Sequence, residues 1–210
     1  MNARQVHFLK HIVILSLFAV GLGLIRFLLI GHTSYIWLNW NLFLALIPIL
    51  FAWLAVTLKK KWIIGFMVFA WLGFLPNAPY IITDFIHLAD VGPKSLLWFD
   101  AIMIFVYSLA GLFSWLLSFN ILENHLRWKP WVVWFVGLLS GFGIYLGRYI
   151  RFNTWDIFST PLSLLEKIGD IIISPIEYDP VIAMTLIFMC LLAGTYTYTK
   201  PLIYDEKNKN

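Results

Sequence analysis

Six long runs of apolar residues constrain the fold of this chain more than any other feature. They cover Ile12–Ile30, Leu42–Leu58, Trp62–Ile82, Leu96–Leu122, Trp131–Ile150 and Val181–Tyr198. A helix needs about 20 mainly apolar residues to cross the roughly 30 Å hydrocarbon core of a bilayer. The first five runs show no alternation of apolar and polar residues, which favours helices over a β-barrel. The sequence therefore predicts an all-α fold, a polytopic membrane helix bundle with about six transmembrane helices.

The composition excludes the main soluble classes of protein. Of the 210 residues, 61% are hydrophobic and 12% charged, whereas a soluble domain carries about 25% charged residues. A soluble core of this length could not bury so much apolar surface, since roughly a third of the surface of a small domain's chain stays in contact with water. A secreted domain, a nucleic-acid-binding module and a free cytosolic enzyme are therefore excluded, and the predicted surroundings are a lipid bilayer.

No long linker or internal repeat divides the chain. We expect a single transmembrane helical domain over residues 1–200, followed by a short polar cytoplasmic tail at residues 201–210.

The distribution of basic residues predicts the orientation in the membrane. If the N-terminus is cytoplasmic, ten Lys and Arg residues fall on the cytoplasmic side and five fall on the outer side or at the outer ends of spans. Lys59, Lys60 and Lys61 crowd into one very short loop. Because cytoplasmic loops carry an excess of basic residues, we expect both termini to be cytoplasmic.

The segment Ser159–Pro175 has the pattern of an amphipathic helix. Its apolar residues fall on one helical face, opposite Glu166, Lys167 and Asp170. The apolar set consists of Leu164, Leu165, Ile168, Ile171 and Ile172. This pattern predicts a helix that lies in the outer membrane interface, not a seventh span.

The third span is interrupted by Pro76-Asn77-Ala78-Pro79. At 1.5 Å per residue, Pro76 lies only ~21 Å above the inner boundary, so the break falls inside the membrane. The freed backbone groups must find partners, and we expect the segment to be packed in protein or to line a water-filled cavity. Asn77 has two open roles, bonding to this backbone or contacting a ligand.

Charged residues within the predicted spans fall at a common depth. Counted along their helices, Arg26, Asp100, Arg148 and Arg151 all lie in the outer layer of the membrane, and no ionisable residue falls in the inner third. Charges inside a membrane are costly and mark functional sites or internal ion pairs.

The fragment LPNAPYIITDFIHL, residues 75–88, places Asp84 three residues before His87. On a helix this spacing puts a carboxylate and an imidazole on one face, as an acid–base pair or a divalent metal requires. Alternatively, Thr83 or Asp84 caps a helix that starts after Pro79. Two ligands are fewer than the three or four of a zinc site, so the residues identify no metal or cofactor.

The fragment YLGRYIRFNTWD, residues 145–156, places Arg148 and Arg151 at the same spacing. Two neighbouring guanidinium groups suit a phosphate or a carboxylate. The predicted substrate-binding set is Arg148, Arg151, Asn77, Asn153, Asp156 and Asp100. The alternative is internal neutralisation of the arginines by Asp84, Asp100 or Asp156.

Both fragments resemble the signature blocks of the domain-of-unknown-function family 1361, a group of uncharacterised bacterial integral membrane proteins. The second block of that family more often reads Asn-Ser-Trp-Asp, where this chain has Asn153-Thr154-Trp155-Asp156 and keeps the hydroxyl group. The resemblance implies a multi-pass protein of the bacterial cytoplasmic (plasma) membrane and brings no established activity.

Small residues recur at four-residue spacing in the fifth span, as Gly137/Gly141 and Gly143/Gly147. This spacing predicts close helix packing within the chain.

The leading functional hypothesis is a membrane-embedded site that faces the extracytoplasmic side and takes an anionic lipid or a lipid-linked phosphate. Arg148 and Arg151 would hold the phosphate, and Asp84 with His87 would act as base or metal ligands. Two alternatives are a non-catalytic accessory subunit of a cell-envelope complex and a small-solute transporter. Whether the protein is an enzyme, and its oligomeric state, stay open at this point.

Overall fold

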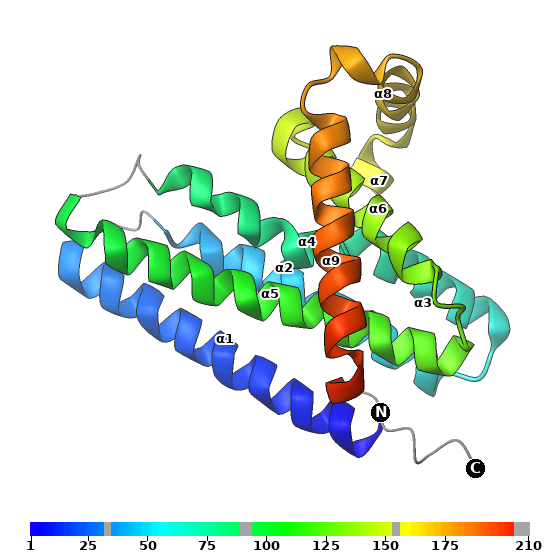
Figure 1. Ribbon diagram of the computed structural model, residues 1–210, viewed down its shortest axis with the longest axis horizontal. Helices are drawn as coiled ribbons and strands as arrows, with labels where there is room; N and C mark the ends of the chain where they lie inside the picture. Colours follow the sequence, from blue (N-terminus) through cyan, green and yellow to red (C-terminus); the bar gives the residue numbers. More distant parts are fainter. Residues whose placement is uncertain (32–34, 89–93, 153–155, 204–210) are drawn as a thin grey trace. The chain divides into compact units, whose positions relative to one another are not determined.

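The computed structural model describes residues 1–31, 35–88, 94–152 and 156–203, and the backbone but not the side chains of residues 157 and 158. All regular elements in these ranges are helices (Figure 1). In chain order they are α1 (Ala3–Ile30), α2 (Trp37–Thr57), α3 (Lys61–Phe74), α4 (Asn77–Tyr80), η1 (Ile81–His87), η2 (Lys94–Leu96), α5 (Leu97–Leu126), α6 (Val132–Tyr145), η3 (Leu146–Ile150), α7 (Asp156–Ser159), α8 (Pro161–Ile173), η4 (Pro175–Glu177) and α9 (Val181–Ile203).

Six helical segments are long and apolar enough to cross a membrane, which confirms the predicted all-α, multi-pass class. They are Ala3–Ile30, Trp37–Thr57, Lys61–His87, Lys94–Leu126, Val132–Ile150 and Val181–Ile203. Several run past the predicted ends. The first helix starts nine residues early because Asn2 and Gln5 form a capping box, in which each side chain accepts the other's backbone N–H, at 2.8 and 2.9 Å.

The helices fall into two compact units, which we describe separately. The first comprises Met1–Trp128 with Thr199–Asn210, and the second comprises Lys129–Tyr198. Helices α1 to α5 and the last turn of α9 belong to the first unit. Helices α6 to α8 and most of α9 form the second.

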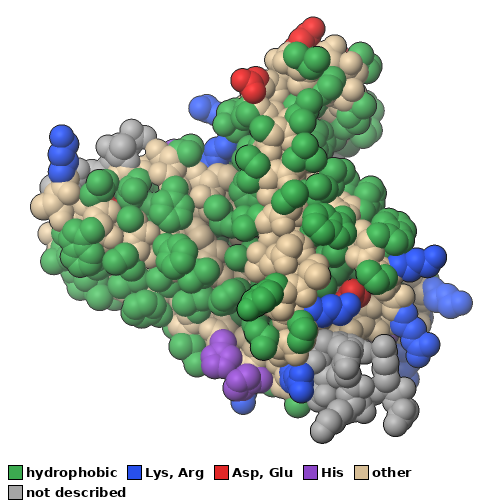
Figure 2. All heavy atoms as spheres, in the orientation of Figure 1, with side chains coloured by type: hydrophobic (Ala, Val, Ile, Leu, Met, Phe, Trp, Pro, Cys, Tyr) green, Lys and Arg blue, Asp and Glu red, His purple; other side chains and the backbone are tan. Residues whose placement is uncertain are grey.

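Helix α5 is the central helix of the first unit, where it packs against α1, α2 and α4. In its most apolar 18-residue stretch 72% of the residues are buried, against 44% or less for any other span. Side chains over α1 and α5 are mainly hydrophobic on the face shown in Figure 2. Large apolar residues such as Leu17 and Leu28 of α1 are 68% and 72% exposed. A surface of this kind is stable in contact with lipid, not water.

The interruption of the third span is confirmed, and protein packs around it. Helix α3 ends at Phe74, and the carbonyl oxygen of Phe74 accepts a hydrogen bond from Asn77 Nδ2 at 3.0 Å. Ala78 and Pro79 are buried. A Cβ added to Gly111 of α5 would stand 2.1 Å from the carbonyl oxygen of Ala78. Of the two roles open for Asn77, the backbone role is present; a contact of Asn77 with a ligand stays a prediction.

In the second unit α6 packs closely on α9 through glycines. A Cβ on Gly141 would lie 2.6 Å from the carbonyl oxygen of Thr185, and one on Gly137 would lie 3.3 Å from that of Met189. The predicted close packing of Gly137 and Gly141 within the chain is therefore confirmed.

The predicted amphipathic segment forms helix α8, with Pro161 in its first turn. Half of its apolar face packs on protein, since Ile171 is buried against Tyr145 and Val181. The other half is open, with Leu165 and Ile172 more than 60% exposed. The helix is present, and its location in the outer interface stays a prediction.

Candidate functional site

Four alternate residues, one just before α2 and three in its first turns, contact polar or charged side chains of the first unit. They are Tyr35, Trp37, Asn39 and Asn41, which we call the α2 polar hub. Successive members are rotated by about 200° around a helix, so they reach different neighbouring elements.

Asp84 is held by one member of the hub. It is fully buried in η1, and its Oδ2 accepts a hydrogen bond from Asn41 Nδ2 at 3.0 Å. Residues three apart nearly eclipse in a 3₁₀ helix, so His87 follows Asp84 along the same side of η1. The ring of His87 packs edge-on against Trp37, with 5.3 Å between ring centroids. A carboxylate and an imidazole thus line one side of η1, next to α2.

The alternative that Thr83 or Asp84 caps a helix is wrong. Helix η1 starts directly after Tyr80, so both residues lie inside it. Thr83 Oγ1 instead donates to the carbonyl oxygen of Tyr80 at 2.7 Å. The reason is that the chain continues from α4 into η1 without leaving helical geometry, and no new helix start exists there.

Arg26 and Asp100 form an ion pair between α1 and α5. Arg26 Nε lies 2.5 Å from Asp100 Oδ1, Nη2 lies 3.1 Å from Oδ2, and both residues are at most 2% exposed. The guanidinium carbon stands 5.6 Å from the centroid of the Tyr35 ring. The two charges therefore lie side by side and Asp100 is neutralised within the first unit, while their location in the outer layer of the membrane stays a prediction. A role for Asp100 in substrate binding stays a prediction.

Sequence reasoning missed the two asparagines of the hub. Asn39 Oδ1 accepts a hydrogen bond from Tyr107 Oη at 2.7 Å, which joins α2 to α5. The available signal was the pair of amides in Asn39-Trp40-Asn41, because polar side chains are rare in an apolar span unless they have partners.

The second unit contains a cationic turn, residues 146–152, at the end of α6. The helix widens into a π-helical turn, Leu146–Ile150, that carries the half-buried Arg148. Arg151 then adopts the left-handed conformation with φ of 62° and is exposed. The N–H groups of Arg151 and Phe152 both bond to the carbonyl oxygen of Leu146. Their common helix face was predicted from α-helical spacing, and the structure differs because of this wider turn.

The conformation of Arg151 is unusual for its residue type. The left-handed region costs a residue with a Cβ roughly 1–2 kcal/mol, and glycine normally takes this place at a helix end. In the described ranges, Arg127 is the other non-glycine residue with positive φ. Widened helical turns and strained backbone concentrate at functional sites.

Lys167 of α8 is a further cation of the second unit. Its Nζ donates to Tyr178 Oη at 3.1 Å and stands 4.6 Å from the ring centroid of Tyr178. This hydrogen bond raises the pKa of Lys167 above its ordinary value. Tyr178 packs against the core cluster of Tyr145, Ile171 and Val181, as do Leu146 and Ile150 of the cationic turn.

Two further residues of the predicted binding set lie after this turn. Asp156 starts α7, where its Oδ1 accepts a hydrogen bond from Ser159 Oγ at 3.1 Å. Asn153 lies outside the described residues. Internal neutralisation of Arg148 or Arg151 by Asp84, Asp100 or Asp156 stays a prediction.

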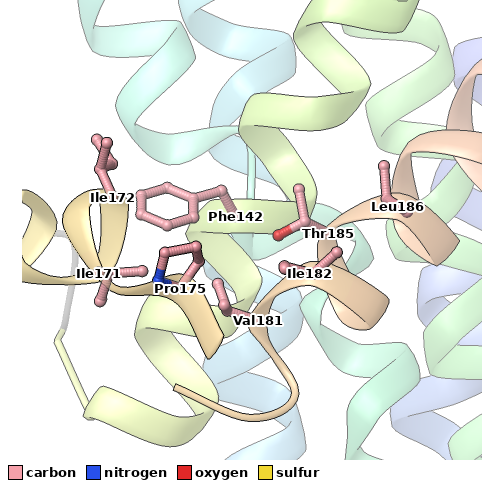
Figure 3. Close-up of a pocket in the computed structure, with 8 residues that line it drawn as sticks. All are labelled: Phe142, Ile171, Ile172, Pro175, Val181, Ile182, Thr185 and Leu186. Carbon is pink, nitrogen blue, oxygen red and sulfur yellow. The ribbon is translucent and has the colours of Figure 1, made fainter. Parts of the chain in front are cut away.

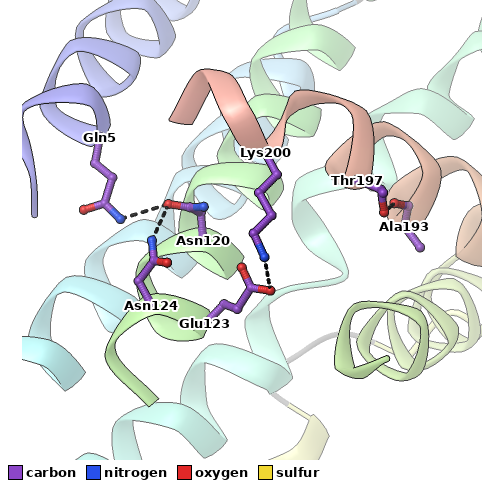
Figure 4. Close-up of polar contacts among 7 residues, drawn as sticks. All are labelled: Gln5, Asn120, Glu123, Asn124, Ala193, Thr197 and Lys200. Atoms are coloured by element: carbon purple, nitrogen blue, oxygen red, sulfur yellow. Dashed lines mark hydrogen bonds and ion pairs between the residues drawn. The ribbon is translucent and has the colours of Figure 1, made fainter. Parts of the chain in front are cut away.

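A second buried polar cluster was missed, at the C-terminal end of α5. Asn120 Oδ1 accepts hydrogen bonds from Gln5 Nε2 at 2.9 Å and from Asn124 Nδ2 at 3.0 Å, and Lys200 Nζ pairs with Glu123 Oε1 at 2.8 Å (Figure 4). The helix runs four residues beyond the predicted end, and Glu123 is a buried residue of this extension. The expectation that ionisable residues inside the spans gather in one outer layer stays a prediction.

The separation of the two ion pairs matches a membrane. Asp100 and Glu123 are 23 residues apart on α5, or ~34 Å at the helical rise. Arg4 Nη1 donates to the carbonyl oxygen of Pro201 at 3.0 Å, so the first helix begins where the last one ends. This proximity agrees with an even number of crossings.

The described residues do not support a metal site at Asp84 and His87. Within these ranges, no three side chains of His, Cys, Asp or Glu are grouped so that they could hold a metal ion. His32 and Asp90, whose side chains are of the types that bind metals, lie outside the described residues.

The fold and these buried polar groups define a multi-pass helical membrane protein. More narrowly, the chain belongs to the family described as "Protein of unknown function (DUF1361)", whose model matches residues 40–193. The resemblance predicted from the two sequence blocks is thereby confirmed. No curated protein and no solved structure matches the chain.

Proposed function

We propose that the second unit binds the phosphate group of an anionic lipid or a lipid-linked phosphate. The observation that carries this proposal is the cationic turn, in which a π-helical turn and a left-handed arginine present Arg148 and Arg151 at the end of a span. Guanidinium groups bind phosphate through paired N–H donors, which lysine does not reproduce. Lys167 supplies further positive charge in the same unit.

An amphiphile suits this position better than a water-soluble anion. The turn ends an apolar span, and Leu146 and Ile150 within it pack into the core of the unit. A ligand that contacts both the arginines and the adjoining apolar surface needs a charged head group and a hydrocarbon part. The excess of basic residues on the opposite side supports an extracytoplasmic location in a bacterial plasma membrane.

A chemical role for Asp84 and His87 is a separate proposal about the first unit. The full burial of Asp84 and its hydrogen bond from Asn41 support a carboxylate that is oriented by the protein. A buried carboxylate beside an imidazole suits proton transfer.

The transporter alternative gains little support from α5. Its buried hydroxyl groups at Ser108, Ser114 and Ser118 donate to backbone carbonyl oxygens, at 2.8, 2.5 and 3.0 Å. Hydroxyl groups used in this way join or stiffen membrane helices, and this favours a packing role over a solute path.

The experiment is a lipid analysis of the full chain after reconstitution and mild extraction. One set of vesicles contains equal amounts of phosphatidylglycerol and phosphatidylcholine, and a second contains polyprenyl phosphate in phosphatidylcholine. We expect the wild type to retain one of the two anionic lipids. Losing charge-assisted hydrogen bonds of about 1.5–3 kcal/mol should lower this retention roughly tenfold or more in the double variant Arg148→Gln, Arg151→Gln.

The matched control is the double variant Arg127→Gln, Lys129→Gln, which removes the same charge at the other end of the spans. Equal retention in both double variants would contradict the proposal, as would the absence of any anionic lipid on the wild type.

A further inference from the structure

The second unit contains an apolar pocket between α6, α8 and α9, with a volume of about 210 Å³ (Figure 3). Its lining consists of Phe142, Ile171, Ile172, Pro175, Val181, Ile182, Thr185 and Leu186. Apart from the hydroxyl group of Thr185, these side chains are hydrocarbon. The pocket is larger than the roughly 150 Å³ cavity that holds a benzene molecule in a protein interior.

The pocket and the cationic turn share one wall. Ile171 and Val181 line the pocket and also form the core cluster with Tyr145. Leu146 and Ile150, which flank Arg148, pack against that same cluster. A single layer of side chains therefore separates the cationic turn from the pocket. A ligand whose charged part lies on the turn has the apolar lining of the pocket close by.

Thr185 carries the one hydroxyl group among the lining residues, and its oxygen is buried beneath the surface of the pocket. Its Oγ1 is buried and has no hydrogen-bond partner in the part of the chain that the structure describes. Threonine in a helix commonly donates to the carbonyl oxygen four residues before it. Thr197 of the same helix does so, to Ala193 at 2.7 Å (Figure 4). An unmade hydrogen bond is costly for a buried hydroxyl group, so this group would gain free energy if the side chain turned into the pocket and met an acceptor supplied by a ligand.

We propose that the pocket holds an acyl chain of a diacyl lipid, whose ester carbonyl accepts the hydrogen bond of Thr185 and whose anionic head group lies on the cationic turn. This inference rests on the proposed function and names the lipid class, since a polyprenyl phosphate has no ester carbonyl. Charge complementarity and the hydrocarbon lining select this occupant. Because the pocket is small, it takes part of one chain, and the remainder extends into the bilayer.

The first test maps the chain by photo-crosslinking. The full protein is reconstituted in phosphatidylcholine vesicles that contain phosphatidylglycerol with a diazirine on one acyl chain. We expect crosslinks in peptides that contain Phe142 or Thr185. Leu186→Trp fills the pocket and should reduce these crosslinks about tenfold, an effect worth roughly 1.4 kcal/mol.

Leu191→Trp is the matched control, because Leu186 and Leu191 are both partly exposed on α9, at 44% and 38%, and only Leu186 lines the pocket. Equal crosslinking of these peptides in both variants would overturn the inference.

The second test concerns the ester group. Phosphatidylglycerol is compared with its diether analogue, which lacks both carbonyl oxygens, on the wild type and on Thr185→Val. Valine keeps the shape of threonine, so Thr185 packing against Gly141 is retained. The wild type should retain the ester lipid about threefold to tenfold better than the ether lipid, the value of one hydrogen bond. Thr185→Val should remove this preference, and a wild type without any preference overturns the ester assignment.

The two proposals fail in different ways. If Leu186→Trp still retains phosphatidylglycerol through Arg148 and Arg151 and keeps its crosslinks, the pocket is not the acyl site and head-group binding stands. If the wild type retains no anionic lipid in either vesicle, the proposed function fails first.

Discussion

Gly111 of α5 lies directly against the carbonyl oxygen of Ala78, so that a Cβ on this glycine would stand 2.1 Å away from that oxygen. The contact explains how the break in the third span is tolerated. The backbone between Pro76 and Pro79 loses part of its helical hydrogen bonding, and α5 covers it at a distance that only glycine allows.

Gly111→Ala should therefore destabilise the protein. The atom opposite the new methyl group is backbone, which cannot turn aside, so we expect a loss of about 1–3 kcal/mol in the free energy of unfolding. Gly65→Ala on α3 is the control, because a Cβ there meets nothing within 4 Å. Unfolding in detergent measures both variants, and equal stabilities would contradict the packing described here.

Replacing one partner of the ion pair of Arg26 and Asp100 should lower the free energy of unfolding more than replacing both partners. Asp100→Asn leaves a charged guanidinium group that is 2% exposed, and the expected loss is about 3–5 kcal/mol. The double variant Arg26→Met, Asp100→Asn removes the charge and should recover much of this loss. Unfolding in detergent measures both variants. A double variant that is less stable than Asp100→Asn would contradict this prediction.

Asn41 should be energetically coupled to Asp84. Asn41→Leu removes a donor from a fully buried carboxyl group, and we expect a loss of about 1–3 kcal/mol. In the background of Asp84→Leu the same change should cost much less. A double-mutant cycle on the free energy of unfolding measures this coupling, and additive effects would show that the hydrogen bond has no role.

Lys167 should keep its charge over the whole neutral and mildly alkaline range. Its hydrogen bond to Tyr178 raises its pKa, so its interaction is fully present below the ordinary pKa of lysine and is lost only as the pH rises through the raised value. Retention of phosphatidylglycerol should therefore stay constant between about pH 7 and pH 9. A decline in this range that disappears in Lys167→Gln would contradict the raised pKa.

The class of fold could be predicted because it depends on composition and run length alone. Six apolar runs produced six spans, and the two prolines of the third span produced its break. The spacing of Gly137 and Gly141 likewise predicted their close packing, since small residues are what allow helices to approach in a membrane.

Side-chain partners were harder to predict, because they depend on which helices meet. Arg26 and Asp100 could be assigned a common depth, but their pairing required the contact of α1 with α5. Asn41 and Gln5 bond to residues 43 and 115 positions away, and no local pattern marks such pairs. The apolar run ends at Leu122, because hydropathy falls one turn before the helix ends, and Glu123 lies in this last turn.

The turn at Arg151 was unpredictable for another reason. Its left-handed conformation is one that sequence patterns assign to glycine or asparagine. An arginine at such a position indicates a role for its side chain more strongly than a glycine would, because the protein keeps this side chain although it strains the backbone.

The most direct test of the proposed site is native mass spectrometry of the protein after gentle extraction, comparing the wild type, Arg151→Gly and Arg127→Gly. Both substitutions place glycine at a left-handed position, so both variants should be at least as stable as the wild type. We predict that the wild type and Arg127→Gly carry the mass of a bound anionic lipid and that Arg151→Gly has lost it. The same bound mass on all three proteins would contradict the assignment of the cationic turn as the phosphate site.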